Sequence, residues 1–174
     1  DSEIIPMDKI SNEEQLDREL NKWLENIQAC DYNIKETHEL TMILPENYYN
    51  PGSYSNWIRV GWALKNTDNR LFLSWVKFSS MSKSFNYNDI PDFYNMWMNF
   101  DDETTNTGLL TYRSIIYWAK QDSSSEKYKS VHDSTIDYFI ELTLPQPDQV
   151  KYSIVEFDLA MVLYQIFKDK FVCT

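Results

Sequence analysis

The stretch SNWIRVGWALKNTDNRLFLSWVKFSSMSKSFNYN, Ser55 to Asn88, contains three of the six tryptophans of this 174-residue chain. It also contains five of the sixteen basic residues and a single acidic residue, Asp68. The net charge of this stretch is +4, whereas the segments before and after it carry −8 and −7. A basic, aromatic block therefore lies in the middle of a chain whose net charge is −11.

Apolar residues within this block recur at helical spacing. A first stripe consists of Trp57, Val60, Gly61 and Leu64. It predicts a helix that begins near Ser53 or Ser55. A glycine inside a helix costs about 1 kcal/mol relative to alanine, so we expect Gly61 to mark a close helix crossing. After the turn NTDN, a second and shorter helix is predicted from Leu71, Phe72, Trp75 and Phe78.

The segment before the block is also predicted to be helical. Ser11 and Glu14 have the spacing of a capping box, which places the start of a helix there. One face of that helix would carry Leu16, Leu20, Trp23, Leu24 and Ile27. A second helix over residues 35–44 is expected to end before Pro45, because proline disfavours the α conformation in the residue that precedes it.

Two more helices are predicted after the block. Pro91 suits the first turn of one, and Thr111 is the cap candidate of the other. Their apolar faces would be Phe93, Met96, Trp97 and Phe100 in the first and Tyr112, Ile115, Ile116 and Ala119 in the second. Only three glycines occur in the chain, and no apolar run approaches the roughly 20 residues that span a membrane. The expected fold class is mainly α, a compact multi-helix domain with flanking N- and C-terminal helices.

The last third of the chain is less regular. Gln121 to Lys129 is rich in serine and charge, which is typical of a linker. The stretch STIDYFIELTL that follows mixes strand and helix character. Ser153 and Glu156 repeat the capping-box spacing, and the helix that they would start carries Val155, Leu159, Val162, Leu163 and Ile166 on one face. We interpret this helix as the start of a further domain.

No pattern in the sequence predicts catalysis. The chain lacks GxxxxGK[ST], so a P-loop nucleotide site is not expected. Cys30 and Cys173 are isolated, which argues against a zinc site and for a reducing compartment. His132 and its neighbour Asp133 are interpreted as a solvated pair. Asp101, Asp102 and Glu103 are interpreted as an acidic loop, although a metal-dependent nuclease is an alternative. We therefore predict no catalytic, cofactor or metal residues in this chain.

The basic residues of the block allow two interpretations. They are Arg59, Lys65, Arg70, Lys77 and Lys83. In one, they contact the phosphates of single-stranded DNA, although an overall pI of about 4.5 opposes strong binding. In the other, they form a solvated surface that pairs with the acidic flanks. The residues expected to build the core are Trp57, Gly61, Trp62, Trp75, Trp97 and Trp118.

The order of these features resembles a known family. The landmarks are WIRVGWALKNT, LFLSWVKFSSMS, FYNMWMNF and LLTYRSIIYWAKQ, and the resemblance covers about residues 34–120. They resemble the PriCT-2 module, the helical primase C-terminal 2 domain. The tail FDLAMVLYQIFKDKFVCT also resembles the lead-in to the D5-type region of primase-helicases of nucleocytoplasmic large DNA viruses. Most of the landmarks coincide with predicted core residues, so the resemblance implies a fold and a context rather than catalytic residues.

The resemblance implies that the chain is a piece of a longer viral protein with a primase before it and a superfamily 3 helicase after it. The expected organisation is a flanking helix in 1–33, the PriCT-2-like domain in 34–120, a linker in 121–145 and the start of the D5-type region in 146–174. ATP and magnesium would serve the parent protein only. Expected partners are the other domains of the parent, single-stranded DNA or a second copy, with no membrane. The alternative is a module that binds only proteins, such as a helicase loader. The expected location is intracellular, in a viral replication compartment.

Overall fold

Seven α-helices and several 3₁₀ turns make up the part of the chain that the computed structural model describes, residues 9–101 and 110–143. These residues contain no strand, and the predicted mainly α class is confirmed. The helices are α1 (Glu13–Glu25), α2 (Tyr32–Met42), α3 (Tyr54–Thr67), α4 (Phe72–Ser80), α5 (Ile90–Met98), α6 (Tyr112–Asp122) and α7 (Ser125–Thr143). The helix predicted after Ser153 lies outside the described residues.

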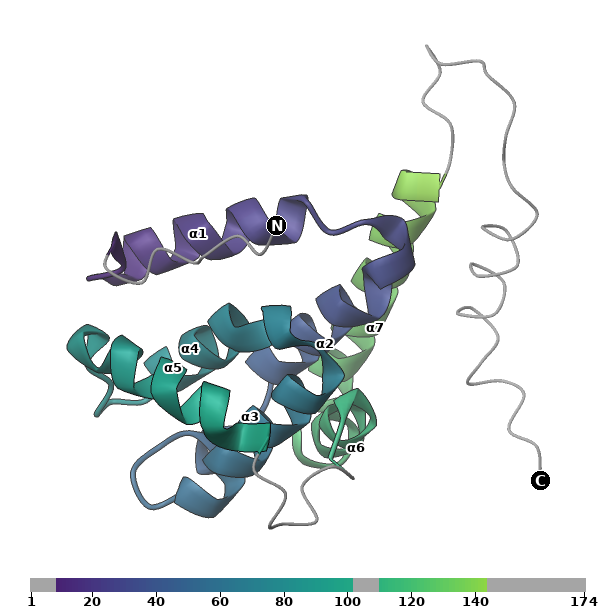
Figure 1. The fold of residues 1–174 in the computed structure, drawn as a ribbon. Coiled ribbons are helices and arrows are strands. Elements are labelled where there is room, and N and C mark those ends of the chain that lie inside the picture. Colours follow the sequence, from purple (N-terminus) through teal and green to yellow (C-terminus); the bar gives the residue numbers. More distant parts are fainter. Residues whose placement is uncertain (1–8, 102–109, 144–174) are drawn as a thin grey trace.

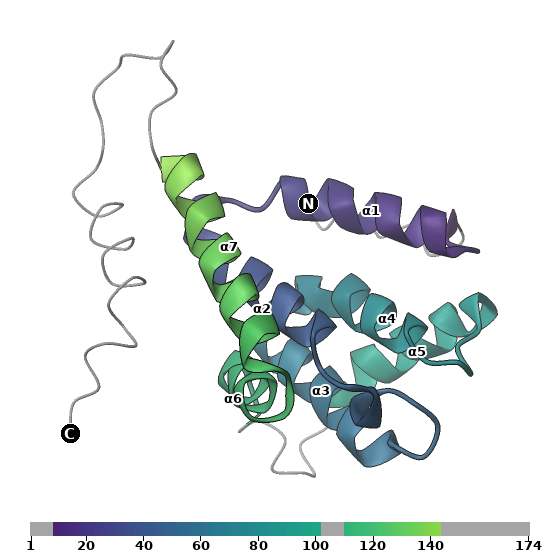
Figure 2. The ribbon, with the colours of Figure 1, turned by 180° about the vertical axis from the view of Figure 1, so that it is seen from behind.

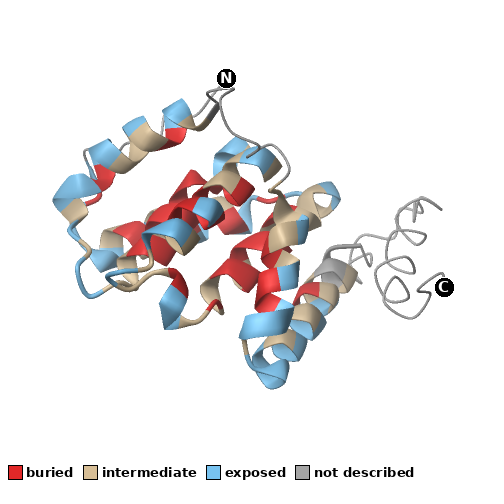
Figure 3. Cartoon of the chain, turned by 90° about the horizontal axis from the view of Figure 1, so that it is seen from below, coloured by how far each residue is buried: buried red, intermediate tan, exposed pale blue. Residues whose placement is uncertain are grey.

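The helices of the basic, aromatic block lie at the centre of the fold. Helices α3 and α4 pack against each other, α1 lies along α4, and α5 packs on the other side of α4 (Figure 1). On the opposite side of the molecule, α2 is flanked by α6 and α7, and α6 also contacts α3 (Figure 2). Buried residues concentrate in the central helices, whereas α1 and α7 expose much of their surface (Figure 3).

Helix α1 begins one residue later than the capping-box spacing predicts. Asn12 is the cap, and its side chain accepts a hydrogen bond of 2.9 Å from the backbone N–H of Gln15. The Gln15 side chain in turn accepts from the backbone N–H of Ser11 at 2.8 Å. The predicted pairing of Ser11 with Glu14 is therefore wrong, because the neighbouring Asn12 is an equally good cap with Gln15 at the third helical position. The predicted apolar face is confirmed, with Leu16, Leu20 and Leu24 buried against the core.

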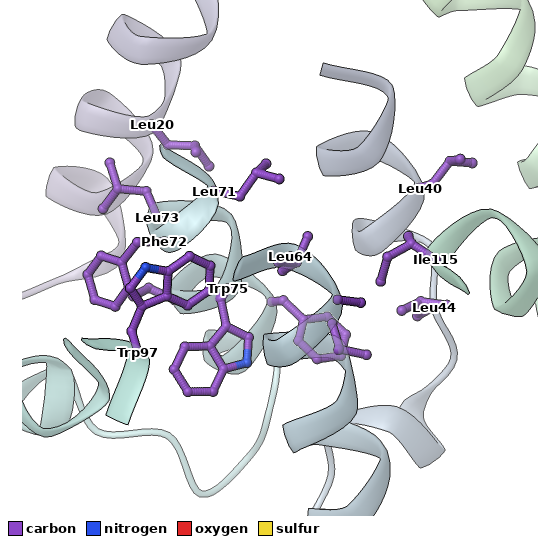
Figure 4. Close-up of a cluster of buried hydrophobic side chains, with 14 of the residues drawn as sticks. Leu20, Leu40, Leu44, Leu64, Leu71, Phe72, Leu73, Trp75, Trp97 and Ile115 are labelled. Carbon is purple, nitrogen blue, oxygen red and sulfur yellow. The ribbon is translucent and has the colours of Figure 1, made fainter. Parts of the chain in front are cut away.

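An aromatic cluster around Trp75 forms one half of the core. Trp75 is fully buried and lies near Trp97, with 5.8 Å between the ring centroids (Figure 4). The centroid of the Phe100 ring lies 5.2 Å from that of Trp75. Gly61 on α3 lies directly against its indole: a Cβ atom at Gly61 would be 2.9 Å from Cε2 of Trp75 and 3.0 Å from Cε2 of Phe100. Any other residue would overlap with these rings, and the predicted close approach at Gly61 is confirmed.

The remaining predicted core tryptophans differ in burial. Trp97 and Trp118 are buried with Trp75, but Trp57 and Trp62 are only partly buried. Trp57 stacks on Trp75 with ring centroids 4.8 Å apart and donates its indole N–H to Ser79 Oγ at 2.8 Å. One face of the Trp57 ring thus contacts the core, and its indole N–H is bonded to Ser79. This arrangement suits a residue at the edge of the hydrophobic core.

The prediction of a linker is wrong for residues 125–143, which form α7. This helix packs on α2 and places Tyr128 and Val131 against the core, with Thr135 buried. Their spacing of three and four residues is helical, but tyrosine and threonine make the stripe weakly apolar. His132 Nδ1 lies 3.8 Å from Glu36 Oε1 of α2, so the expected solvated pair with Asp133 is also wrong.

A second buried polar contact joins α2 to α4. His38 is 5% exposed, and its Nδ1 atom forms a hydrogen bond of 2.9 Å with Ser74 Oγ. Burial, together with the positive charges of Lys35 and Lys77, lowers the pKa of His38 from 6.5 to about 4. The imidazole is therefore neutral in the folded protein at neutral pH.

We expect Gly61→Ala to destabilise the fold by about 1 to 2 kcal/mol, because the added methyl group must displace packed rings and the cost exceeds the gain in helix propensity. Ser55→Ala, at an exposed position of the same helix, is the matched control and should be neutral or slightly stabilising. Chemical denaturation of both variants provides the measurement. A Gly61→Ala protein as stable as wild type would show that α3 does not approach Trp75 closely.

We expect His38 to make the protein less stable at acidic pH. Its pKa is lower in the folded state than the unfolded value of 6.5, so the unfolded state binds more protons as the pH falls. The contribution of His38 to the free energy of unfolding should be fully present above pH 6.5 and should fall by about 3 kcal/mol as the pH falls towards 4. His38→Asn, which keeps a group able to bond Ser74, should be less stable at neutral pH but show a flatter decline. Urea denaturation across this range measures both, and parallel curves for the two proteins would contradict the assignment.

Candidate nucleic-acid interface

The five basic residues proposed to contact DNA do not gather in one place. Arg59 lies beside α6, Lys65 beside α5, Arg70 beside the turn before α2, and Lys77 beside α1. Lys83 is exposed in the turn after α4 and forms no ion pair with any residue that the structure describes. Each residue therefore has to be considered with its own neighbours.

Arg70 is held by two acidic residues. Its Nε atom lies 3.0 Å from Asp68 Oδ1, and its Nη1 atom lies 3.0 Å from Asp31 Oδ2. Hydrogen bonds to Asp68 and then to Asp31 raise the pKa of Arg70. Partial burial opposes ionisation of Asp68, yet the bonds from Arg70 hold the pKa of this carboxyl below its usual value. The guanidinium thus joins the turn before α4 to the turn before α2.

Lys77 is engaged in the same way with α1. Its Nζ atom lies 2.6 Å from Asp17 Oδ1 and 3.1 Å from Glu13 Oε1. Although burial opposes its charge, bonds to Asp17 and Glu13 raise the pKa of Lys77. With only 20% of its side chain exposed, Lys77 presents little positive surface to a ligand. Two of the five candidates therefore pair with acidic residues, in line with the second interpretation of the basic block.

Lys65 and Trp97 share a single acceptor. The Nζ atom of Lys65 and the indole N–H of Trp97 donate to Oδ1 of Asn69 at 2.7 Å and 3.0 Å. The ammonium also lies 5.5 Å from the centre of the Trp97 ring. Lys65 is partly exposed, and these contacts place its charge over the aromatic cluster at the end of α3.

Arg59 has a different environment, where α3 meets α6. Its guanidinium carbon lies 5.0 Å from the ring centre of Trp118, and its side chain is exposed. Tyr117, the neighbour of Trp118 on α6, is 63% exposed. Nearby, Tyr48 donates a hydrogen bond to Asp122. Burial is the larger cause and this hydrogen bond the second cause of a raised pKa of Tyr48. Both Arg59 and Tyr117 lie near enough to act electrostatically on the Tyr48 hydroxyl.

Sequence reasoning missed three residues of this region: Tyr117, Arg113 and Lys120. All three are exposed, and they recur at spacings of four and three along α6. Arg113 packs against its own neighbour, with its guanidinium 5.9 Å from the Tyr112 ring. The spacing of the three residues on a predicted helix was a signal that could have shown them to share one side. We call the exposed surface formed by Arg59, Arg113, Tyr117 and Lys120 the α3–α6 face.

A groove lies at the end of α6, next to Asp122. It has a volume of about 550 Å³ and separates the end of α2 from the turn between α6 and α7. Its apolar wall includes Met42, Ile43 and Val131. Its polar lining includes Ser123, Ser130 and Lys127, together with the acidic residues Glu46 and Asp122. This combination suits a peptide or another protein side chain better than a highly charged ligand.

No group of three or more histidine, cysteine, aspartate or glutamate residues suited to a metal occurs within residues 9–101 and 110–143. Asp102 and Glu103 lie outside the described residues, so the acidic loop and the nuclease alternative are not tested. Over the same described part of the chain, none of the helices has the length and apolar character required to span a membrane.

Comparison with known families identifies the central part of the chain. Residues 37–119 match the model of the family described as Primase C terminal 2 (PriCT-2). The match begins inside α2 and ends in α6, so it includes the Gly61 and Trp75 contact and excludes α1 and α7. No curated protein and no solved structure matches the chain. The PriCT-2 resemblance is thus confirmed, and residues 37–119 are similar to a primase-associated C-terminal module.

Proposed function

We propose that this chain is a non-catalytic module of a replicative primase-helicase that couples primer synthesis to DNA unwinding. The observation that carries the proposal is the PriCT-2 match over residues 37–119. The proposed parent protein is a viral, D5-like enzyme with a superfamily 3 helicase, in which ATP and magnesium are bound by other domains. The module would lie between the primase and the helicase and transmit the position of one to the other.

The arrangement of the matched residues supports a connecting rather than a catalytic role. The landmark tryptophans pack with one another or with core residues, as in the stack of Trp57 on Trp75. Such residues specify a fold, while the surface around them is left to bind partners. The ion pairs of Arg70 and Lys77 connect the matched region to the segments before it.

The alternative is a module that binds only other proteins, without touching DNA. The groove between α2 and the α6–α7 turn favours this alternative, because it combines an apolar wall with hydroxyl groups, one lysine and the carboxylates of Glu46 and Asp122. A helix or loop of a neighbouring domain or of a second copy would fit such a surface. Both functions place the parent protein in replication, and they differ in which surface makes the essential contact.

The test uses the full-length polypeptide that contains this sequence, on a forked DNA template. On this template, primer synthesis should depend on ATP-driven unwinding. When residues 37–119 are replaced by a flexible linker, primers should no longer form on the fork. ATP hydrolysis, and primer synthesis on a single-stranded template, should survive the replacement. The isolated chain should perform neither reaction. A full-length protein without primer synthesis, or coupling that survives the replacement, would contradict the proposal.

A pair of single substitutions separates the two functions in the same assay. Ser130→Trp fills the groove, whereas Ser134→Trp places the same ring on α7 at an exposed position that does not line it. Under the protein-binding alternative, coupling should fall with Ser130→Trp and not with Ser134→Trp. Under DNA guidance, both variants should couple as wild type does.

A further inference from the structure

We propose that single-stranded DNA binds across the α3–α6 face, with Tyr117 stacking on a base and Arg59 and Lys120 contacting phosphates. The inference rests on the proposed function, because a module between a primase and a helicase meets the unwound strand. It assigns the DNA contact to one surface. Of the five basic residues considered from the sequence, it retains Arg59 and gives the others no direct role.

The distribution of charge favours this surface. Helix α3 carries Arg59 and Lys65 with no acidic residue, and α6 carries two basic residues against Asp122 alone. The two helices together have a net charge of +3 within a chain of −11. By contrast, α1 carries five acidic residues against two basic ones. Without Lys65, which lies beside α5, Arg59, Arg113 and Lys120 against Asp122 still leave a net charge of +2 at the junction of α3 and α6. A strand of phosphates is therefore attracted there and repelled by α1.

The side chains of the face also suit unpaired bases. Tyr117 exposes 63% of its surface, although a ring of this size is usually better covered in a helical domain. The Arg59 guanidinium is planar and lies over the Trp118 ring, which holds it in place while its outer side is exposed. Single-strand binding proteins combine such aromatic and guanidinium surfaces with positive charge.

The one acidic residue in these helices, Asp122, is already counted in their net charge of +3. Asp122 accepts the hydrogen bond of the Tyr48 hydroxyl at the end of α6, so its carboxylate is directed to a partner. An acidic protein segment would use the basic residues equally well but would gain nothing from an exposed Tyr117 ring. The exposed aromatic ring is thus the feature that favours DNA over an acidic protein partner.

The experiment measures fluorescence anisotropy of a labelled oligothymidylate titrated with the full 174-residue chain over a series of salt concentrations. Weak, salt-sensitive binding is expected. Tyr117→Ala should weaken it about tenfold with an unchanged salt slope, because stacking on a base involves no counterion release. Arg59→Glu should reduce the slope of log affinity against log salt by about 0.7, the contribution of one phosphate contact to a single strand.

The controls locate the effect. Lys83→Glu changes the charge by the same amount as Arg59→Glu, but at an exposed residue outside the α3–α6 face. It should therefore alter the affinity for the oligonucleotide much less. Arg59→Lys keeps the charge and the aliphatic cover of Trp118, so it should keep the salt slope while losing affinity. Thermal melting confirms that each variant is folded. A duplex of the same length should bind more weakly, because its bases are already stacked.

Three results would overturn the inference. The first is that the chain does not bind the oligonucleotide even at low salt. The second is that Lys83→Glu and Arg59→Glu lose the same amount of affinity. The third is that polyglutamate of matched charge displaces the oligonucleotide and Tyr117→Ala does not change the affinity. Each would leave the proposed coupling role intact, since that role is measured on the full-length protein by primer synthesis. If coupling fails while the isolated chain binds DNA as expected, the proposed coupling role is wrong and the DNA-binding surface stands.

Discussion

The contact between Gly61 and Trp75 is the constraint on which the rest of the fold depends. Because Gly61 has no side chain, α3 can lie directly against the indole of Trp75, and the space that a methyl group would fill is taken by that ring and by Phe100. Trp75 then serves as the centre of a cluster to which α3, α4 and α5 all contribute rings. The contact lies inside the PriCT-2 match, which excludes the first and last helices.

This packing explains how a basic, aromatic block is accommodated in an acidic chain. The rings of α3 and α4 turn inwards, so the charges of these helices are left at the periphery. There Arg70 and Lys77 attach the N-terminal segments through Asp31 and Asp17, over separations of 39 and 60 residues along the sequence. The positive residues thus serve two purposes: some neutralise the acidic flank and stabilise its docking, while Arg59 remains on an exposed aromatic surface. Exposed ion pairs each contribute little to stability, so the docking of α1 depends mainly on Leu16, Leu20 and Leu24.

Periodicity predicted the helices that carry strong apolar stripes, because the spacing of apolar residues along a helix can be read from the local sequence. The start of α1 was displaced by one residue, since Ser11 and Asn12 are both good caps and only packing selects between them. Helix α7 was missed because serine and charge dominate its first turns, and the stripe through Tyr128 and Thr135 gains its burial from α2. Contacts between distant segments, such as Lys77 with Asp17, have no local signature at all.

The central proposal is that Trp75, Trp97 and Trp118 are buried in the core while the α3–α6 face meets single-stranded DNA. The most direct measurement is a titration of the isotope-labelled chain with oligothymidylate, followed residue by residue through its backbone amide resonances. The account predicts that the largest shifts map to Arg59, Tyr117 and their neighbours, while the indole N–H resonance of the buried Trp75 stays in place. Shifts concentrated on α1 and α4 around Lys77, or around the groove at Ser130, would contradict it.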